Sequence, residues 1–455
     1  MTEKIISRQG IRVALTVIAA LIAGLLVSFI PFADMSEAAS RTLGIFTVAT
    51  ILWILEPFPL YVTSFVIVFL EVTFLGLSGG PLGYTGKRYT VFLHPFFDTV
   101  VVLFLGGFVM ARAVKRYGLD ERIARAILTR VGSKPSIVLL GMMVTTAVLS
   151  MWISNTATTA LMIAVAVPIV RSFPADEPFR KAIILGIPFA SNIGGIGTPI
   201  GTPPNAIAMG ILGNLGHGIS FLQWMLIGLP VVIVLLALCW RILCMLFPAR
   251  ISRLDVQFAS EDAIDQRSTV ILGVFGLVVI LWLTTSLHGI PSAIISLVPL
   301  IFFFGFGFLD DDDLADLGWG ILFIIGGGMS LGVAMNASGL SQWIVDQIPF
   351  ASMGRIGILF AFAGAGVVMT TFISNSATAN LLIPIVVGIS AISPVVGAVV
   401  VALTSSAAMI LPISTPPNAI AYGSKLIDVR DMIRAGTIVT VIAALLIPIF
   451  LFLVL

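Results

Sequence analysis

The amino-acid sequence predicts an all-α polytopic membrane protein with two inverted-topology repeats, re-entrant hairpins and broken helices. Three observations predict this fold class. Hydrophobic residues make up 58% of the 455 residues, and only 10% are charged. Apolar runs of about 20 residues, the length of a spanning helix, fill most of the chain. Two polar motifs that interrupt these runs each occur twice, in the same order.

The repeated motifs define the two halves. Ser154-Asn155-Thr156 recurs as Ser374-Asn375-Ser376, and Thr202-Pro203-Pro204-Asn205 recurs as Thr415-Pro416-Pro417-Asn418. The glycines at 106 and 118 also recur at 327 and 339, with a constant offset of 221 (327 − 106 and 339 − 118). Internal repetition on this scale is typical of secondary transporters.

The first quarter of the chain predicts four spans and an interfacial helix. The spans lie near 12–30, 42–56, 60–77 and 98–114. The first run has no small-residue cleavage site, so we expect a retained helix and not a signal peptide. Basic residues precede it, and more occur between Arg112 and Lys134, so both ends of this segment should be cytoplasmic. Segment 120–131 has apolar and basic residues at helical spacing, which predicts an amphipathic helix at the interface.

The next part of the chain predicts a hairpin and a broken helix. Two apolar arms flank the first Ser-Asn-Thr motif, and their outer ends are both basic. This pattern predicts a re-entrant hairpin at 136–170, whose tip must be buried in protein or line a cavity. The run 182–212 is too long for a straight span and contains several Gly and Pro residues, so we expect two half-helices. Further spans follow near 223–247, 269–287 and 291–308.

The second half repeats this order with the opposite orientation. The loop 336–353, which matches the basic cytoplasmic loop of the first half, contains no Lys or Arg, so it should lie outside. We therefore expect hairpin 355–392 to enter from the opposite face, followed by broken helix 396–425 and a last span at 433–455. The prediction totals eleven spans and two hairpins, with a cytoplasmic N-terminus and an external C-terminus.

The predicted domain boundaries follow from this order. The repeats occupy 98–247 and 319–455, and the segments 1–97 and 248–318 supply scaffold spans.

The motif chemistry indicates cation-coupled anion transport. Broken helices expose N–H groups at one end, which attract anions, and C=O groups at the other, which coordinate cations. No Arg or Lys lies in the four motifs, so a bound anion would need helix ends, neutral donors and co-bound cations. Na⁺ suits oxygen ligands of this kind.

With these paired motifs, the sequence resembles the divalent anion:sodium symporter family, which includes bacterial dicarboxylate transporters and eukaryotic sodium-coupled carboxylate and sulfate carriers. The resemblance covers nearly the whole chain. It implies an elevator mechanism, a homodimer in the inner (plasma) membrane, and a substrate held between the two hairpin tips. The implied function is Na⁺-coupled uptake of di- or tricarboxylates, most simply C4-dicarboxylates such as succinate, malate or fumarate.

The resemblance also implies roles for individual residues. One substrate carboxylate would contact Ser154, Asn155 and Thr156, and the other Ser374, Asn375 and Ser376, while the floor would be formed by Thr202, Pro203, Thr415 and Pro416. Two Na⁺ sites are implied: one at Ser150, Asn155 and Gly201, the other at Thr370, Ile373, Asn375 and Ser414. Ser376 departs from the Thr of the first copy, which slightly enlarges the pocket and leaves the substrate size open.

Several alternatives remain open at this stage. Within the same fold, the chain could exchange dicarboxylates without net Na⁺ coupling, or carry sulfate or another divalent anion. An intramembrane hydrolase using Ser154 or Ser374 is disfavoured, because no His, Lys or Asp in the motifs would activate a serine. Currents far above carrier rates would indicate a channel instead. The sequence has no basic patch with interleaved aromatic residues, so nothing in it indicates nucleic-acid binding. Cys239 and Cys244 are expected to pack within a helix.

Two acidic residues lie in or beside apolar runs. Glu71 falls within the third predicted span, where a carboxyl is a functional candidate by default; the simpler interpretation places it near the outer end or paired within the protein. Glu56, next to Pro57 and Pro59, could be a coupling group. Its position at an expected cytoplasmic end favours an interfacial turn.

Overall fold

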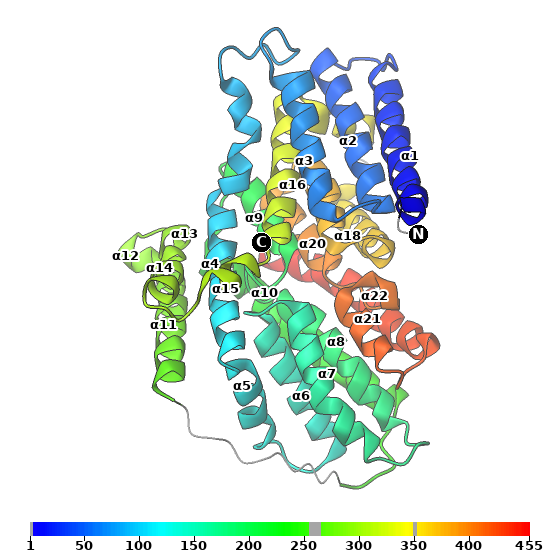
Figure 1. Ribbon diagram of the computed structural model, residues 1–455. Coiled ribbons are helices and arrows are strands. Elements are labelled where there is room, and N and C mark those ends of the chain that lie inside the picture. The colour runs from blue at the N-terminus through cyan, green and yellow to red at the C-terminus, as the bar shows by residue number, and fades with distance from the viewer. Residues whose placement is uncertain (1–2, 254–264, 349–352) are drawn as a thin grey trace.

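The structure, a computed structural model, describes residues 3–253, 265–348 and 353–455. This described part of the chain is helical throughout and contains no strand. Eight of its helices are long and apolar enough to cross a membrane. Figure 1 shows the N-terminal helices at one end of the molecule and α5 to α8 at the other.

The N-terminal segment forms helices α1, α2 and α3, which lie side by side (Figure 1) at Glu3–Ser28, Glu37–Leu55 and Leu60–Glu71. A π-helical turn, Val72–Gly76, continues α3, and 3₁₀ turns at Arg88–Phe92 and His94–Phe97 lead to α4. Helices α1 and α2 approach closely at Gly24 and Gly44, because a Cβ on Gly24 would lie 2.6 Å from the Gly44 carbonyl oxygen. Such small-residue contacts are typical of helices that pack within membranes.

The first repeat contains seven helices. They are α4 (Thr99–Arg116), α5 (Leu119–Leu128), α6 (Pro135–Ser150), α7 (Asn155–Arg171), α8 (Phe179–Gly195), α9 (Pro203–Asn214) and α10 (Phe221–Leu246). The predicted hairpin 136–170 is therefore the pair α6 and α7, and the predicted broken helix 182–212 is the pair α8 and α9. The amphipathic helix predicted at 120–131 is α5.

Five short or medium helices connect the repeats. They are α11 (Gln266–Leu283), α12 (Thr285–His288), α13 (Ser292–Ile295), α14 (Leu297–Gly305) and α15 (Asp311–Ala315). The span predicted at 291–308 is interrupted at Ser296, between α13 and α14. Pro299 explains the interruption, because it has no N–H to donate to the Ile295 carbonyl one turn earlier.

The second repeat follows the same order. Its helices are α16 (Trp319–Ala337), α17 (Leu340–Gln347), α18 (Gly354–Phe372), α19 (Asn375–Val386), α20 (Pro394–Ser405), α21 (Pro416–Gly423) and α22 (Val429–Val454), with a 3₁₀ turn at Pro412–Ser414 before α21. The glycines predicted to correspond both adopt left-handed backbone, with φ of +62° at Gly118 and +77° at Gly339. Each begins the short helix of its repeat, α5 or α17.

The two repeats interlock through their broken helices. Helix α9 of the first repeat packs against α19 and α20 of the second, and α21 of the second packs against α7 and α8 of the first. In Figure 1, α6, α7 and α8 lie below α18 and α20. This exchange brings both hairpin turns and both unwound segments to the middle of the molecule.

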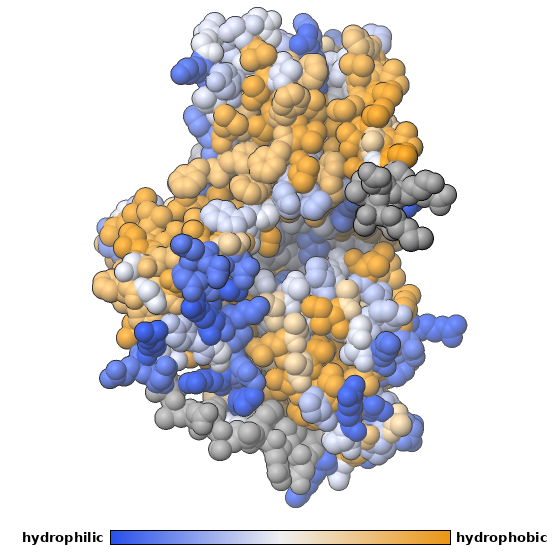
Figure 2. Space-filling model, viewed as in Figure 1, coloured by the Kyte–Doolittle hydropathy of each residue, from blue (hydrophilic) through white to orange (hydrophobic). Residues whose placement is uncertain are grey.

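The surface suits a lipid environment. Helix α1 exposes apolar side chains along its length, including Leu15, Ile22 and Leu26. Figure 2 shows hydrophobic residues over much of the upper part of this face and hydrophilic residues gathered lower down. An apolar surface of this extent is unusual for a soluble protein, so the fold is that of a multi-pass membrane protein.

Candidate functional site

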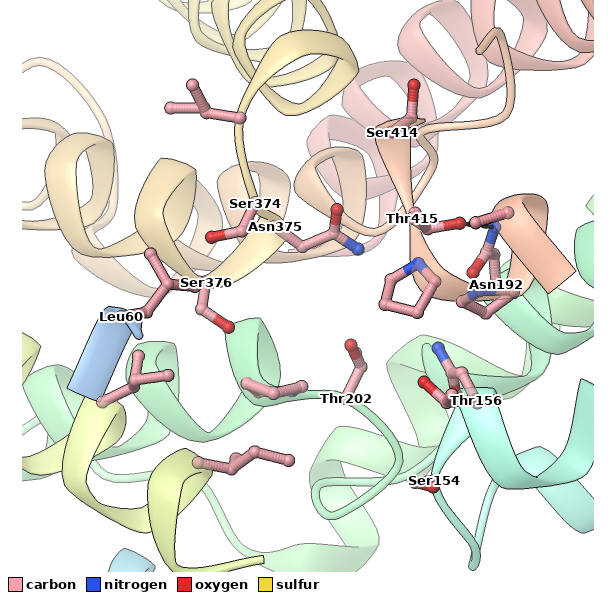
Figure 3. A pocket seen from close by; sticks show the side chains of 18 of the residues that line it. Leu60, Ser154, Thr156, Asn192, Thr202, Ser374, Asn375, Ser376, Ser414 and Thr415 are labelled. Carbon is pink, nitrogen blue, oxygen red and sulfur yellow. Dashed lines mark hydrogen bonds between the residues drawn. The ribbon is translucent and has the colours of Figure 1, made fainter. Parts of the chain in front are cut away.

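A cavity of about 760 Å³ lies where the two repeats meet. All ten residues predicted to bind substrate line it, from both hairpin tips and both unwound segments: Ser154, Asn155, Thr156, Thr202, Pro203, Ser374, Asn375, Ser376, Thr415 and Pro416. Figure 3 shows Ser374 and Ser376 on one side of the cavity and Ser154 and Thr156 on the other. The size is in the usual range for small-molecule sites.

Each hairpin tip presents the N-terminus of a helix to the cavity. Ser154 caps α7 by accepting a hydrogen bond from the Ala157 amide at 3.3 Å. Ser374 caps α19 in the same way, from the Ala377 amide at 3.1 Å. The remaining first-turn N–H groups have no partner within the helix, and the helix dipole gives this end a partial positive charge. Two such ends facing one cavity can hold an anion with two separated carboxylates.

A cluster of oxygen atoms lies behind the first tip. The Ser150 hydroxyl is 2.6 Å from Asn155 Oδ1 and 2.9 Å from the Ser191 carbonyl oxygen. A Cβ placed on Gly195 would lie 2.7 Å from Asn155 Oδ1 and 3.2 Å from the Gly201 carbonyl oxygen. The structure thus brings together Ser150, Asn155 and Gly201, the ligands that the sequence suggested for one Na⁺ site.

The second tip repeats this arrangement. The Thr370 hydroxyl lies 2.7 Å from both Asn375 Oδ1 and the Ser405 carbonyl oxygen. Ile373 and Ser414, the other two ligands suggested for the second Na⁺ site, both line the cavity. Hydroxyl, amide and carbonyl oxygens without a charged ligand suit a hard monovalent cation.

The asparagines of the two Thr-Pro-Pro-Asn motifs hold the unwound segments in place. The Asn205 side-chain amide donates to the carbonyls of Gly195 and Thr198, at 2.9 and 2.8 Å. The Asn418 amide donates to Ala408 and Leu411, at 3.2 and 3.0 Å. These bonds satisfy carbonyls that the helix break leaves without partners.

Asn192 is a cavity residue that sequence reasoning missed. It lies on α8 and is almost completely buried, and its amide donates to Thr415 Oγ1 at 3.2 Å and to Asn418 Oδ1 at 3.3 Å. Figure 3 shows it beside Thr415. The signal was the polar pair Ser191-Asn192 within a long apolar run, but the amide has no counterpart in the second half, which has hydroxyl residues there.

Glu71 lies away from the cavity residues and is fully buried. The hydroxyl of Ser330 on α16 contacts its Oε2, and the same hydroxyl lies 2.9 Å from the Phe92 carbonyl oxygen. One oxygen of Glu71 is thus hydrogen-bonded within the protein, which was one of the two simpler interpretations of the sequence, and Oε1 is buried without a partner among the described residues.

The membrane-length helices, and a central cavity that carries hydroxyl and amide groups among apolar residues, are features of a membrane transporter. A family model described as the sodium:sulfate symporter transmembrane region matches residues 12–453, and the chain belongs to this family.

Two known transporters and one solved structure illustrate what this chain is similar to. SdcS of Staphylococcus aureus, a sodium-dependent dicarboxylate transporter, is 30% identical in an alignment of 435 positions that covers 87% of this chain and 82% of SdcS. An uncharacterised transporter of Schizosaccharomyces pombe is 32% identical in an alignment of 440 positions that covers 92% of this chain and only 50% of that relative's length. The crystal structure of the Alcanivorax borkumensis YdaH transporter matches with a TM-score of 0.54 at 14% identity, covering 80% of this chain and 87% of YdaH. At this identity the match to YdaH concerns the fold alone.

Proposed function

We propose that the protein is a secondary transporter that couples Na⁺ to the uptake of C4-dicarboxylates such as succinate, malate or fumarate. The observation that carries the proposal is the pairing of two helix N-termini across one cavity, with a cluster of uncharged oxygen ligands behind each. One carboxylate would bind Ser154, Asn155 and Thr156, and the other Ser374, Asn375 and Ser376. A Na⁺ ion behind each tip would offset the substrate charge. The dicarboxylate in the name of SdcS supports this substrate class.

The mechanism we propose is an elevator. The hairpins and broken helices of 98–247 and 319–455 would carry the substrate, while 1–97 and 248–318 would hold a fixed scaffold in a homodimer. Reciprocal packing of α9 with α19 and α20, and of α21 with α7 and α8, supports movement of these elements as one body. Basic residues on and around α5 support a cytoplasmic position for that end, and we propose that the C-terminus lies outside a plasma membrane.

Uptake into proteoliposomes tests the proposal. We expect labelled succinate to enter under an inward Na⁺ gradient, and not when choline replaces Na⁺. Asn155 and Asn375 line the cavity, and each accepts a hydrogen bond from a hydroxyl of a proposed Na⁺ site, Ser150 or Thr370. Asn155→Ala and Asn375→Ala should therefore each abolish coupled uptake. Asn214→Ala, at the exposed end of α9, is the matched control and should transport normally. Wild-type uptake by either tip variant would refute the assigned sites.

The same vesicles distinguish the alternatives. Uptake that requires internal dicarboxylate and ignores the Na⁺ gradient would indicate an exchanger. The family description names sulfate, so excess sulfate belongs in the competition panel beside malate, fumarate and citrate. Inhibition by sulfate and not by malate would replace the dicarboxylate proposal with sulfate transport.

A further inference from the structure

One wall of the cavity is the turn between α2 and α3. Ile54, Leu55, Glu56 and Leu60 contribute to it, and Figure 3 shows Leu60 near Ser376 of the second hairpin tip. Glu56 ends α2: its amide donates to the Leu52 carbonyl at 3.1 Å, and its backbone is left-handed, with φ of +42° and ψ of +52°. Glu56 lines the cavity and is exposed. The turn expected at this position is present, but it faces the proposed substrate site.

Glu56 carries the only formal charge among the described residues that line the cavity. The other lining residues are apolar, or carry hydroxyl or amide groups. Among the ion pairs of the described chain, none involves Glu56. Partial burial raises the pKa of the Glu56 carboxyl. In its ionised form this wall gives the cavity a negative fixed charge that no ion pair of the described chain neutralises.

The sign of this charge opposes the substrate and favours the coupling ion. Coulomb energy scales with the product of the charges. At a given distance, the energy with which the carboxylate repels a dianion is therefore twice, and the energy with which it repels a trianion three times, the energy with which it attracts a monovalent cation. For ions at a similar distance from Glu56, if removing the charge changes cation affinity by a factor f, the same change should alter dianion affinity by about f² and trianion affinity by about f³, in the opposite direction.

We propose that Glu56 makes anion binding conditional on prior cation binding and selects dicarboxylates over tricarboxylates. This inference rests on the proposed function and assigns a selectivity role to a residue outside both hairpins. With the Na⁺ sites empty, the only fixed charge facing a dianion is repulsive. Two bound cations reverse the sign of the net charge, and the helix ends can then hold the carboxylates.

The test compares four proteins: the wild type, Glu56→Gln, Glu56→Asp and Glu37→Gln. Glutamine keeps the size of the side chain and removes its charge, while aspartate keeps the charge. Glu37 lies at the opposite end of α2, where it pairs with Arg41 at 2.5 Å, and serves as the matched control. For each protein, the half-saturating concentrations of Na⁺, succinate and citrate are measured at low ionic strength and with added choline chloride.

At low ionic strength we expect Glu56→Gln to raise the half-saturating Na⁺ concentration about threefold. For succinate the half-saturating concentration should fall about ninefold, and for citrate further still, from the Coulomb scaling at cavity dimensions. Both changes should shrink in added salt, because salt screens exposed charges. Glu56→Asp and Glu37→Gln should stay close to the wild type.

Three outcomes would overturn the inference: unchanged constants in Glu56→Gln, Na⁺ and succinate constants that move in the same direction, or an equal effect in Glu56→Asp. The effect of Na⁺ is also measured on purified protein, as the rise in melting temperature when Na⁺ replaces choline. This measurement does not depend on transport. An absence of dicarboxylate uptake in the wild type would reject the proposed function. A weaker Na⁺ response of purified Glu56→Gln would still support the charge effect, and an unchanged one would overturn it.

Discussion

Replacing the two motif asparagines with alanine should destabilise the protein unequally. Asn205 and Asn418 occupy the same place in the two Thr-Pro-Pro-Asn motifs, and each donates two hydrogen bonds to carbonyls of its unwound segment. Losing two buried bonds of this kind should cost about 2–3 kcal/mol. Asn418 also accepts a bond from Asn192, whereas Asn205 Oδ1 is buried without a partner in the described chain. Asn418→Ala should therefore cost about 1 kcal/mol more than Asn205→Ala.

The reason for the difference lies in the repeat. At the offset that relates Thr202 to Thr415, 213 residues (415 − 202), Asn192 falls at Ser405; at the offset that relates the Ser191 and Ser405 carbonyls, 214 residues (405 − 191), it falls at Ser406. Within the described chain, the Ser405 hydroxyl is buried without a partner and the Ser406 hydroxyl donates to the Ala402 carbonyl. Among the described residues, Asn205 therefore receives no bond equivalent to the one that Asn192 donates to Asn418.

Equilibrium unfolding in mixed micelles, with a denaturing detergent and no Na⁺, measures both free energies. The control is the double variant Asn192→Ala, Asn418→Ala, which lacks both partners of the hydrogen bond between Asn192 and Asn418. Equal losses for the two single variants, or a larger loss for Asn205→Ala, would refute the account of this network.

Two further predictions use the same unfolding measurement. Ser330 Oγ contacts both Glu71 Oε2 and the Phe92 carbonyl, and a glutamine at position 71 keeps the size of the side chain and a polar atom that can bond to this hydroxyl. Glu71→Gln should therefore change stability by less than about 1 kcal/mol and Glu71→Ala should cost about 2–4 kcal/mol; equal losses would contradict the importance of this contact. A Cβ on Gly328 would lie 1.7 Å from the buried Asn380 Oδ1, so Gly328→Ala should cost about 1–3 kcal/mol. In contrast, Gly332→Ala meets its nearest atom at 3.5 Å and should be nearly neutral, and a similar cost for both would argue against this tight contact.

The sequence predicted the helix breaks and the cavity lining because a polar motif inside an apolar run cannot face lipid. Its backbone must be buried or face a cavity, and the second copy of each motif showed that the two breaks belong to one site. The positions of Ser154 and Ser374 as helix caps follow from the same motifs, since serine is a favoured N-cap residue.

Features that depend on contacts between distant elements could not be predicted. Asn192 gains its role from Thr415 and Asn418, more than 200 positions away along the chain, and no repeated signal marks it. Glu56 was recognised as a turn residue, but its place beside the cavity depends on how α2 and α3 pack against α16. The hairpin arms are also less regular than expected, because α19 has 12 residues where α7 has 17.

The interlocking of the repeats explains why two weakly polar tips can form one site. Each unwound segment is fixed from within its own repeat by an asparagine, while the helix that follows it packs between helices of the other repeat. Asn192 extends this connection, because it joins α8 of the first repeat directly to Thr415 and Asn418 of the second. A shift of either unwound segment must therefore displace helices of both repeats. This geometry connects the two oxygen clusters to one cavity, so cations bound behind either tip, as we propose, would act on the same anion.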